Sequence, residues 1–161
     1  MTSAISQIRA AVIAAFPPRP ITGAMLEEAS GRWWNYKAAD ALRSHVEGRV
    51  WTDLDAPFVE AHASALISAG TATYVALLPA YLVYLLEHDA YNEVPFFVAG
   101  ELTRTDDPVD ERIFAARLAA LGAEQRSIVR KVIELLTMRA PMERAMRAAL
   151  ATWRNLPNSE Q

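Results

Sequence analysis

The sequence predicts an all-α fold: a single compact domain of seven or eight helices around a central apolar helix at about residues 72–88. Apolar residues recur at spacings of three and four along most of the chain, as on the buried face of a helix. Several expected helices open with a capping residue or with a proline in the first turn. Only residues 94–98 resemble a strand, and that stretch contains Pro95.

The first third of the chain predicts three helices. They are expected over residues 3–16, 21–29 and 37–47. Ser3 and Thr22 are suitable N-caps for the first two, because their hydroxyls can accept hydrogen bonds from backbone N–H groups of the first turn. Pro17 ends the first helix, since a residue before proline disfavours the α region. Gly48 is a natural stop for the third.

A fourth helix follows a short connection. Val50 and Trp51 are expected to anchor that connection in the core. Asp55 is a suitable N-cap and Pro57 a first-turn residue, so we expect a helix that runs without a break to about Ala69.

The central stretch is entirely apolar, aromatic or proline from Tyr74 to Leu86. A membrane span needs roughly 20 apolar residues, so this shorter run indicates a buried helix and no membrane association. Proline lacks an N–H and favours the first turn of a helix. We therefore expect a short helical turn from about residue 71 to Leu77, and a second helix that starts near Pro79.

The last part of the chain predicts four more helical segments. They are expected over residues 95–102, 108–121 and 124–138, and from Pro141 onward. Asp107 and Pro108 form the same cap-and-proline pattern as Asp55 and Pro57. The domain is expected to cover residues 1–155, with residues 156–161 as a flexible tail.

Composition narrows the function classes. The 161 residues include no cysteine, which excludes thiol catalysis, disulfides and thiolate metal sites. No secretory signal is recognisable at the N-terminus, so a cytoplasmic location is expected.

Net charge is only −3, but it is unevenly distributed. Residues 51–111 carry eleven acidic side chains against the single Arg104, and residues 112–154 carry nine basic side chains against three glutamates. The two segments either complement each other in the fold or steer a charged partner.

Motifs for catalysis or cofactor binding are missing. The histidines, His45, His62 and His88, fit no zinc-binding spacing. The chain has no nucleophile elbow, Ser-x-x-Lys pair, phosphate loop or dinucleotide fingerprint. We therefore expect no metal, no cofactor and no enzymatic activity. The acidity of the chain and the lack of a reading motif argue against nucleic acid as the main partner.

Tyrosines share one face of the central helix. At 100° per residue, three tyrosines and a histidine fall on one side. These residues are Tyr74, Tyr81, Tyr84 and His88. Such a face usually packs in a core with its hydroxyls bonded to backbone carbonyls. The alternative is a pocket that binds a small molecule or supports catalysis.

A second candidate site is an acidic and aromatic surface. Three aromatic residues within four positions cannot all face one core from one helix, so at least one ring is expected near the surface as a contact anchor. The stretch around Arg104 has the most exposed-looking composition, and carboxylates surround it. The candidate partner-binding residues are Trp33, Trp34, Tyr36, Glu101, Asp106, Asp107, Asp110 and Glu111.

Several motifs together carry a resemblance to a known family. They are Phe16-Pro17 after an amphipathic helix, a lone Trp51, the core Tyr74-x-x-Leu77-Leu78-Pro79-Ala80-Tyr81-Leu82, and Ala123-Glu124-Gln125 at a helix start. In this order they resemble a family of small bacterial all-helical proteins of unknown function. The resemblance covers about residues 5–137 and implies a fold, but no catalytic residues. In general character such proteins are similar to toxin-immunity proteins.

These observations favour a non-enzymatic protein-binding function. Most concretely, we expect an immunity-type inhibitor whose acidic surface occludes the basic cleft of a cognate toxin. A small-molecule-binding or enzymatic domain that uses the tyrosine and histidine face is the second hypothesis. A structural subunit, or a homodimer held by the C-terminal helix, is the third.

Overall fold

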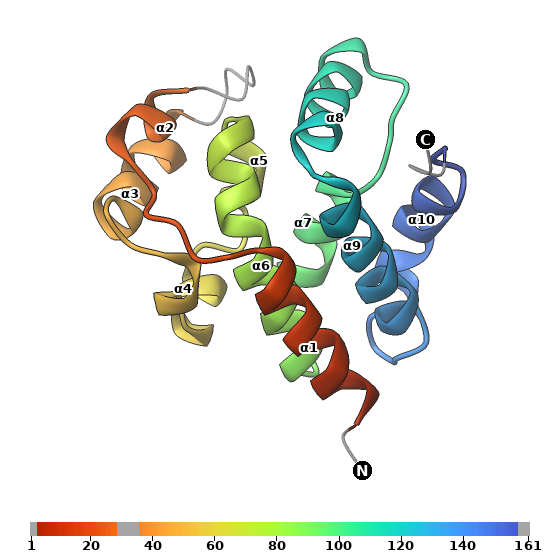
Figure 1. The fold of residues 1–161 in the computed structure, drawn as a ribbon. Helices are drawn as coiled ribbons and strands as arrows, with labels where there is room; N and C mark the ends of the chain where they lie inside the picture. The colour runs from red at the N-terminus through yellow and green to blue at the C-terminus, as the bar shows by residue number, and fades with distance from the viewer. Residues whose placement is uncertain (1–2, 29–35, 158–161) are drawn as a thin grey trace.

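The computed structural model describes residues 3–28 and 36–157, and these residues form an all-α structure (Figure 1). Within them lie ten α-helices and one short 3-10 helix, more than the seven or eight helices predicted. The helices are α1 Ala4–Ala15, α2 Gly23–Glu27, α3 Tyr36–Val46, α4 Ala56–Ala61, α5 Ala65–Ser68, α6 Thr71–Glu87, α7 Val94–Glu101, α8 Pro108–Ala120, α9 Ala123–Thr137 and α10 Glu143–Arg154; the 3-10 helix η2 is Trp51–Asp53. The predicted tail at 156–161 lies mostly outside the described residues.

The predicted N-caps are confirmed. The Ser3 and Thr22 hydroxyls each accept a hydrogen bond, at 3.2 Å, from the N–H three residues on. An Asp55 carboxylate oxygen accepts from the N–H of Phe58 at 3.0 Å. Gly48, which follows α3, has a φ of 78°, a conformation that favours glycine. Local side-chain chemistry therefore sets these helix boundaries.

Helix α6 is the centre of the fold, as predicted, but it is continuous. It runs from Thr71 to Glu87 with Pro79 inside it, so the expected break before Pro79 is wrong. Pro79 lacks the N–H that would donate to the carbonyl of Val75. Eleven of the 17 residues of α6 are buried, and this packing keeps the helix together despite the missing hydrogen bond.

The predicted helix from Asp55 to about Ala69 is divided in two. Helix α4 ends at Ala61, and α5 begins at Ala65. Between them the carbonyl of His62 accepts from the Tyr81 hydroxyl at 2.6 Å and from the N–H of Ala65 at 3.0 Å. A tertiary hydrogen bond from α6 therefore occupies a carbonyl that an unbroken helix would use internally.

Figure 1 places α2, α3 and α4 on one side of α6, and α8, α9 and α10 on the other. Helix α1 packs against both α6 and α9, and α10 packs against α9 and α7. A hydrophobic cluster joins these helices, with residues as far apart in sequence as Val12 and Trp153. The first and last parts of the described chain therefore share one core.

Two buried tryptophans fix connections between helices. The indole N–H of Trp51 donates to the carbonyl of Phe16 at 2.8 Å, so the predicted anchoring role of Trp51 is confirmed. The indole N–H of Trp153 donates to the carbonyl of Leu102 at 2.9 Å. The second bond holds α10 against the end of α7, where the connection to α8 begins.

Candidate functional site

The loop between α7 and α8 is fixed at both ends. At its start the backbone N–H of Arg104 donates to the Thr152 hydroxyl on α10 at 3.1 Å. At its end an Asp107 carboxylate oxygen accepts from the N–H groups of Val109 and Asp110, at 2.9 and 3.0 Å, and so caps α8. Pro108 occupies the first turn, as predicted. The loop therefore presents its side chains from a defined backbone.

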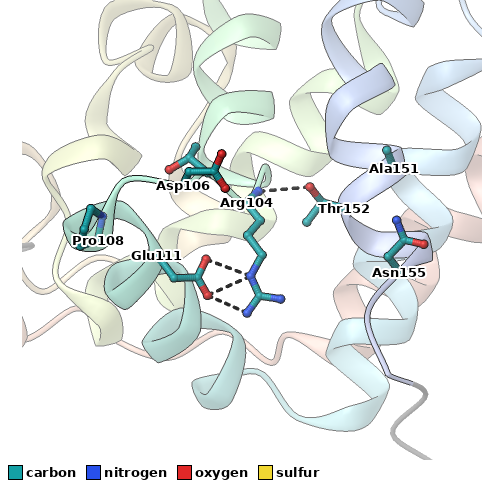
Figure 2. Close-up of a pocket in the computed structure, with 8 residues that line it drawn as sticks. Arg104, Asp106, Pro108, Glu111, Ala151, Thr152 and Asn155 are labelled. Atoms are coloured by element: carbon teal, nitrogen blue, oxygen red, sulfur yellow. Dashed lines mark hydrogen bonds and ion pairs between the residues drawn. The ribbon is translucent and has the colours of Figure 1, made fainter.

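An open groove of about 650 Å³ lies between this loop, the first turn of α8 and the last turns of α10 (Figure 2). Its polar lining residues are Arg104, Thr105, Asp106, Glu111, Thr152 and Asn155. Figure 2 shows Asp106 and Glu111 at the loop and helix side of the groove, and Thr152 and Asn155 on the α10 side.

Arg104 and Glu111 neutralise each other in the groove. The Arg104 Nε lies 2.9 Å from each carboxylate oxygen of Glu111, and one Nη lies 2.7 Å from the nearer oxygen (Figure 2). The hydrogen bond from Arg104 lowers the pKa of the Glu111 carboxyl below its ordinary value. The Arg104 guanidinium also lies over the ring of Phe114, 5.4 Å from its centroid. Asp106 has no cationic partner among the described residues, so the charge of the groove is negative.

The five predicted acidic residues occupy different environments. Asp106 and Glu111 line the groove, Asp107 caps α8 beside it, and Asp110 is half-buried. Glu101 lies apart from them: its side chain is only 9% exposed and forms an ion pair with Arg117 of α8. Glu101 is therefore an interior residue, whereas the other four surround the loop.

Arg117 is an important residue that the sequence analysis missed. Its Nη2 donates to the carbonyls of Leu66 at 2.7 Å and Ala69 at 2.9 Å, and its guanidinium lies 4.1 Å from the centroid of the Tyr74 ring. The spacing contained a signal, because Arg117 lies four residues after Ile113 and four before Leu121. Both of these are buried, so a helical period places Arg117 on the buried face of α8.

The aromatic part of the predicted surface cannot be placed. Trp33 and Trp34 lie outside the described residues. Tyr36 is the first residue of α3, but its side chain is also outside them. Their role as contact anchors stays a prediction.

The tyrosine face of α6 is mostly interior. Tyr74 and Tyr81 are 2% and 0% exposed, and burial raises the pKa of both hydroxyls. The Tyr84 hydroxyl donates to a Glu60 carboxylate oxygen and accepts from the Asn92 amide, both at 2.8 Å. The hydroxyls of Tyr81 and Tyr84 are therefore engaged in hydrogen bonds within the protein.

Only part of this tyrosine and histidine face lines a cavity, which has a volume of about 210 Å³. The cavity is lined by Tyr84 and His88 but not by Tyr74 or Tyr81. The His88 ring stacks on the Tyr84 ring with centroids 4.6 Å apart, and its Nδ1 lies 3.0 Å from the Tyr84 carbonyl. Arg9 and Glu87, which form an ion pair, also line the cavity. The structure thus brings two of the four predicted pocket residues to one cavity.

A second feature that the sequence analysis missed is a histidine pair. The rings of His45 on α3 and His62 after α4 lie with centroids 5.0 Å apart, although 17 positions separate them in the chain. Burial lowers the pKa of His62, and the neighbouring His45 lowers it further. Among the described residues, no three metal-ligating side chains cluster at one place.

Neither a membrane-spanning helix in the described part of the chain nor a similar known protein points to a function. None of the described helices combines the length and apolar character that a membrane crossing requires. Comparison of the chain with protein-family models, with curated proteins and with solved structures gives no match. The resemblance to small bacterial helical proteins therefore stays a prediction.

Proposed function

We propose that this protein binds a basic protein partner through residues 104–111, the end of the connection to α8 and the first turn of that helix, here called the acidic loop. We propose further that it acts as an immunity-type inhibitor of a cognate toxin. The observation that carries the proposal is the unpaired Asp106 carboxylate beside an open groove. Because Glu111 already neutralises Arg104, a cation that enters the groove meets net negative charge. A lysine or arginine of the partner is the complementary group.

The loop is also suited to binding by its rigidity. Its ends are fixed by the Asp107 cap and by the bond from Arg104 to Thr152. A preordered surface loses less conformational entropy on association than a flexible one. The tyrosine and histidine face supports a binding site less well, because its cavity is smaller than the roughly 300–1,000 Å³ of most ligand pockets.

The test reverses the charge at Asp106. The same change at Asp53, away from the groove, is the control. Tagged wild-type protein, Asp106→Lys and Asp53→Lys would be compared in co-expression with the products of neighbouring genes. Asp53 is exposed on η2 and makes no side-chain bond within the described residues. We expect Asp106→Lys to weaken association with a basic partner at least tenfold, and Asp53→Lys to leave it within about twofold.

Asp107 is a poor choice for this test because it has a structural role. Asp107→Ala would remove the cap of α8 and cost about 1 kcal/mol of stability, so weaker binding could reflect a loosened loop. Asp107→Ser removes the charge and keeps an acceptor for the cap.

Equal loss of binding in Asp106→Lys and Asp53→Lys, or no loss in either, would contradict the proposed surface.

A further inference from the structure

A third cavity differs from the other two in its chemistry. It encloses about 550 Å³ between the end of α1, the connection that follows and the face of α6 that carries Pro79. Its walls are mainly apolar, and they include Phe16, Trp51, Val75 and Pro79. This volume lies within the range of roughly 300–1,000 Å³ that ligand pockets occupy.

Of the three polar side chains that line this cavity, two already form hydrogen bonds within the protein. The Gln125 side-chain oxygen accepts from the N–H of Gly122 at 3.0 Å, and its nitrogen donates to the carbonyl of Ala15 at 3.1 Å. The Trp51 indole N–H donates to the carbonyl of Phe16. The exception is Arg19, which lines the cavity and makes no ion pair or hydrogen bond with the described residues.

Arginines in the three cavities allow a direct comparison. In the groove of Figure 2, Arg104 is paired with Glu111, and in the smallest cavity Arg9 is paired with Glu87. The apolar cavity has no acidic residue in its lining, so the charge of Arg19 is not compensated there. This cavity therefore combines apolar walls with one available cation.

We infer that the cavity binds a small amphipathic carboxylate, whose apolar body lies between α6 and Trp51 and whose carboxylate pairs with Arg19. Burial of the apolar body supplies most of the affinity. Arginine donates two parallel hydrogen bonds to a carboxylate, which fixes the orientation of the ligand. The site is separate from the acidic loop, so each proposal can fail without the other.

The experiment compares decanoate with decanol, which has the same apolar body and no charge. Binding is followed by NMR through the Trp51 indole N–H and the Gln125 side-chain amide, both at the cavity. We expect decanoate to shift these signals saturably and to bind more tightly than decanol by up to about fivefold, because Arg19 is exposed and an exposed ion pair adds only a modest preference. A second carboxylate, 4-phenylbutyrate, distinguishes an aromatic from an aliphatic body.

Three variants test the site. Arg19→Gln should remove the preference for the carboxylate over the alcohol. The matched Arg9→Gln, at the arginine already paired with Glu87, should keep it. Ala72 is exposed and lines the cavity, so Ala72→Phe should obstruct it without unfolding the protein and weaken every ligand.

Three results would overturn the inference. The first is that neither decanoate nor 4-phenylbutyrate gives a saturable shift. The second is equal affinity for decanoate and decanol in the wild-type protein. The third is an undiminished carboxylate preference in Arg19→Gln.

Discussion

Arg117 connects four helices through one side chain. From α8 it pairs with Glu101 of α7, bonds to two carbonyls at and just after α5, and lies over the Tyr74 ring of α6. The Arg117 and Glu101 side chains are only 4% and 9% exposed. A charge buried to this extent is tolerated because its partners are charged or strongly polar.

Arg117→Ala should therefore destabilise the protein strongly. It breaks the buried ion pair with Glu101 and removes the donor of two buried hydrogen bonds, at a cost of about 3–5 kcal/mol. Glu111→Gln, which breaks the exposed pair at the groove, should change stability far less. Urea unfolding of both variants measures the difference, and similar stabilities would show that the Arg117 pair is not important for folding.

Capping residues are the part of the structure that the sequence predicts best at this scale. Ser3, Thr22, Asp55 and Asp107 act within three residues of their own position, so their roles can be recognised locally. Glu101 pairs with Arg117, which is 16 residues away on another helix. Acidic composition alone could not separate Glu101 from Asp106.

At the scale of elements, two histidine rings meet where α3 lies beside the turn after α4. His45 and His62 come from these two segments, and the Phe58 ring lies 4.6 Å from that of His62. Burial and the neighbouring imidazole both disfavour the charged form of His62, so its pKa in the folded state is below 6.5. The unfolded chain then binds more protons than the folded one as the pH falls below neutrality.

Stability should consequently decrease in mild acid. The contribution of His62 is fully present above its unfolded pKa of 6.5 and is lost as the pH falls through the lower, folded-state pKa. Urea unfolding at about pH 7.5 and pH 5.5 should show this loss, and His62→Gln should reduce it. An undiminished loss in His62→Gln would contradict this assignment.

Tertiary packing explains the two helix predictions that were wrong. Pro79 usually marks a first turn, but the burial of α6 outweighs the missing hydrogen bond. Residues 56–69 look like one helix, but the Tyr81 hydroxyl bonds to the carbonyl of His62 where the helix breaks. Neither outcome could be predicted from local sequence, because each depends on contacts that exist only in the folded chain.

At the scale of the whole molecule, part of the uneven charge is used internally. Arg117 and Arg139, from the basic C-terminal segment, pair with Glu101 and Asp89, from the acidic middle. Arg139 also donates to the Leu86 carbonyl at 2.9 Å, near the end of α6. In these pairs the basic and acidic segments complement each other within the fold, whereas Asp106 remains available at the surface.

Arg139 should be more important than its ionic partner. Arg139→Ala removes the bond to a carbonyl at the end of α6 as well as the ion pair, and it should cost about 1–2 kcal/mol. Asp89→Asn removes only a largely exposed charge and should cost less than about 0.5 kcal/mol. Thermal or urea unfolding would measure both, and equal losses would show that the carbonyl contact contributes little.

The hydrogen bond between Gln125 and Ala15 joins residues 110 positions apart, and α1 packs directly against α9. Because synthesis runs from the N- to the C-terminus, α1 leaves the ribosome long before α9. The part of α1 that packs against α9 therefore stays uncovered until residues 123–137 have been made, although α6 can cover another part earlier. Nascent chains that end before residue 123 should expose this surface to chaperones and proteases.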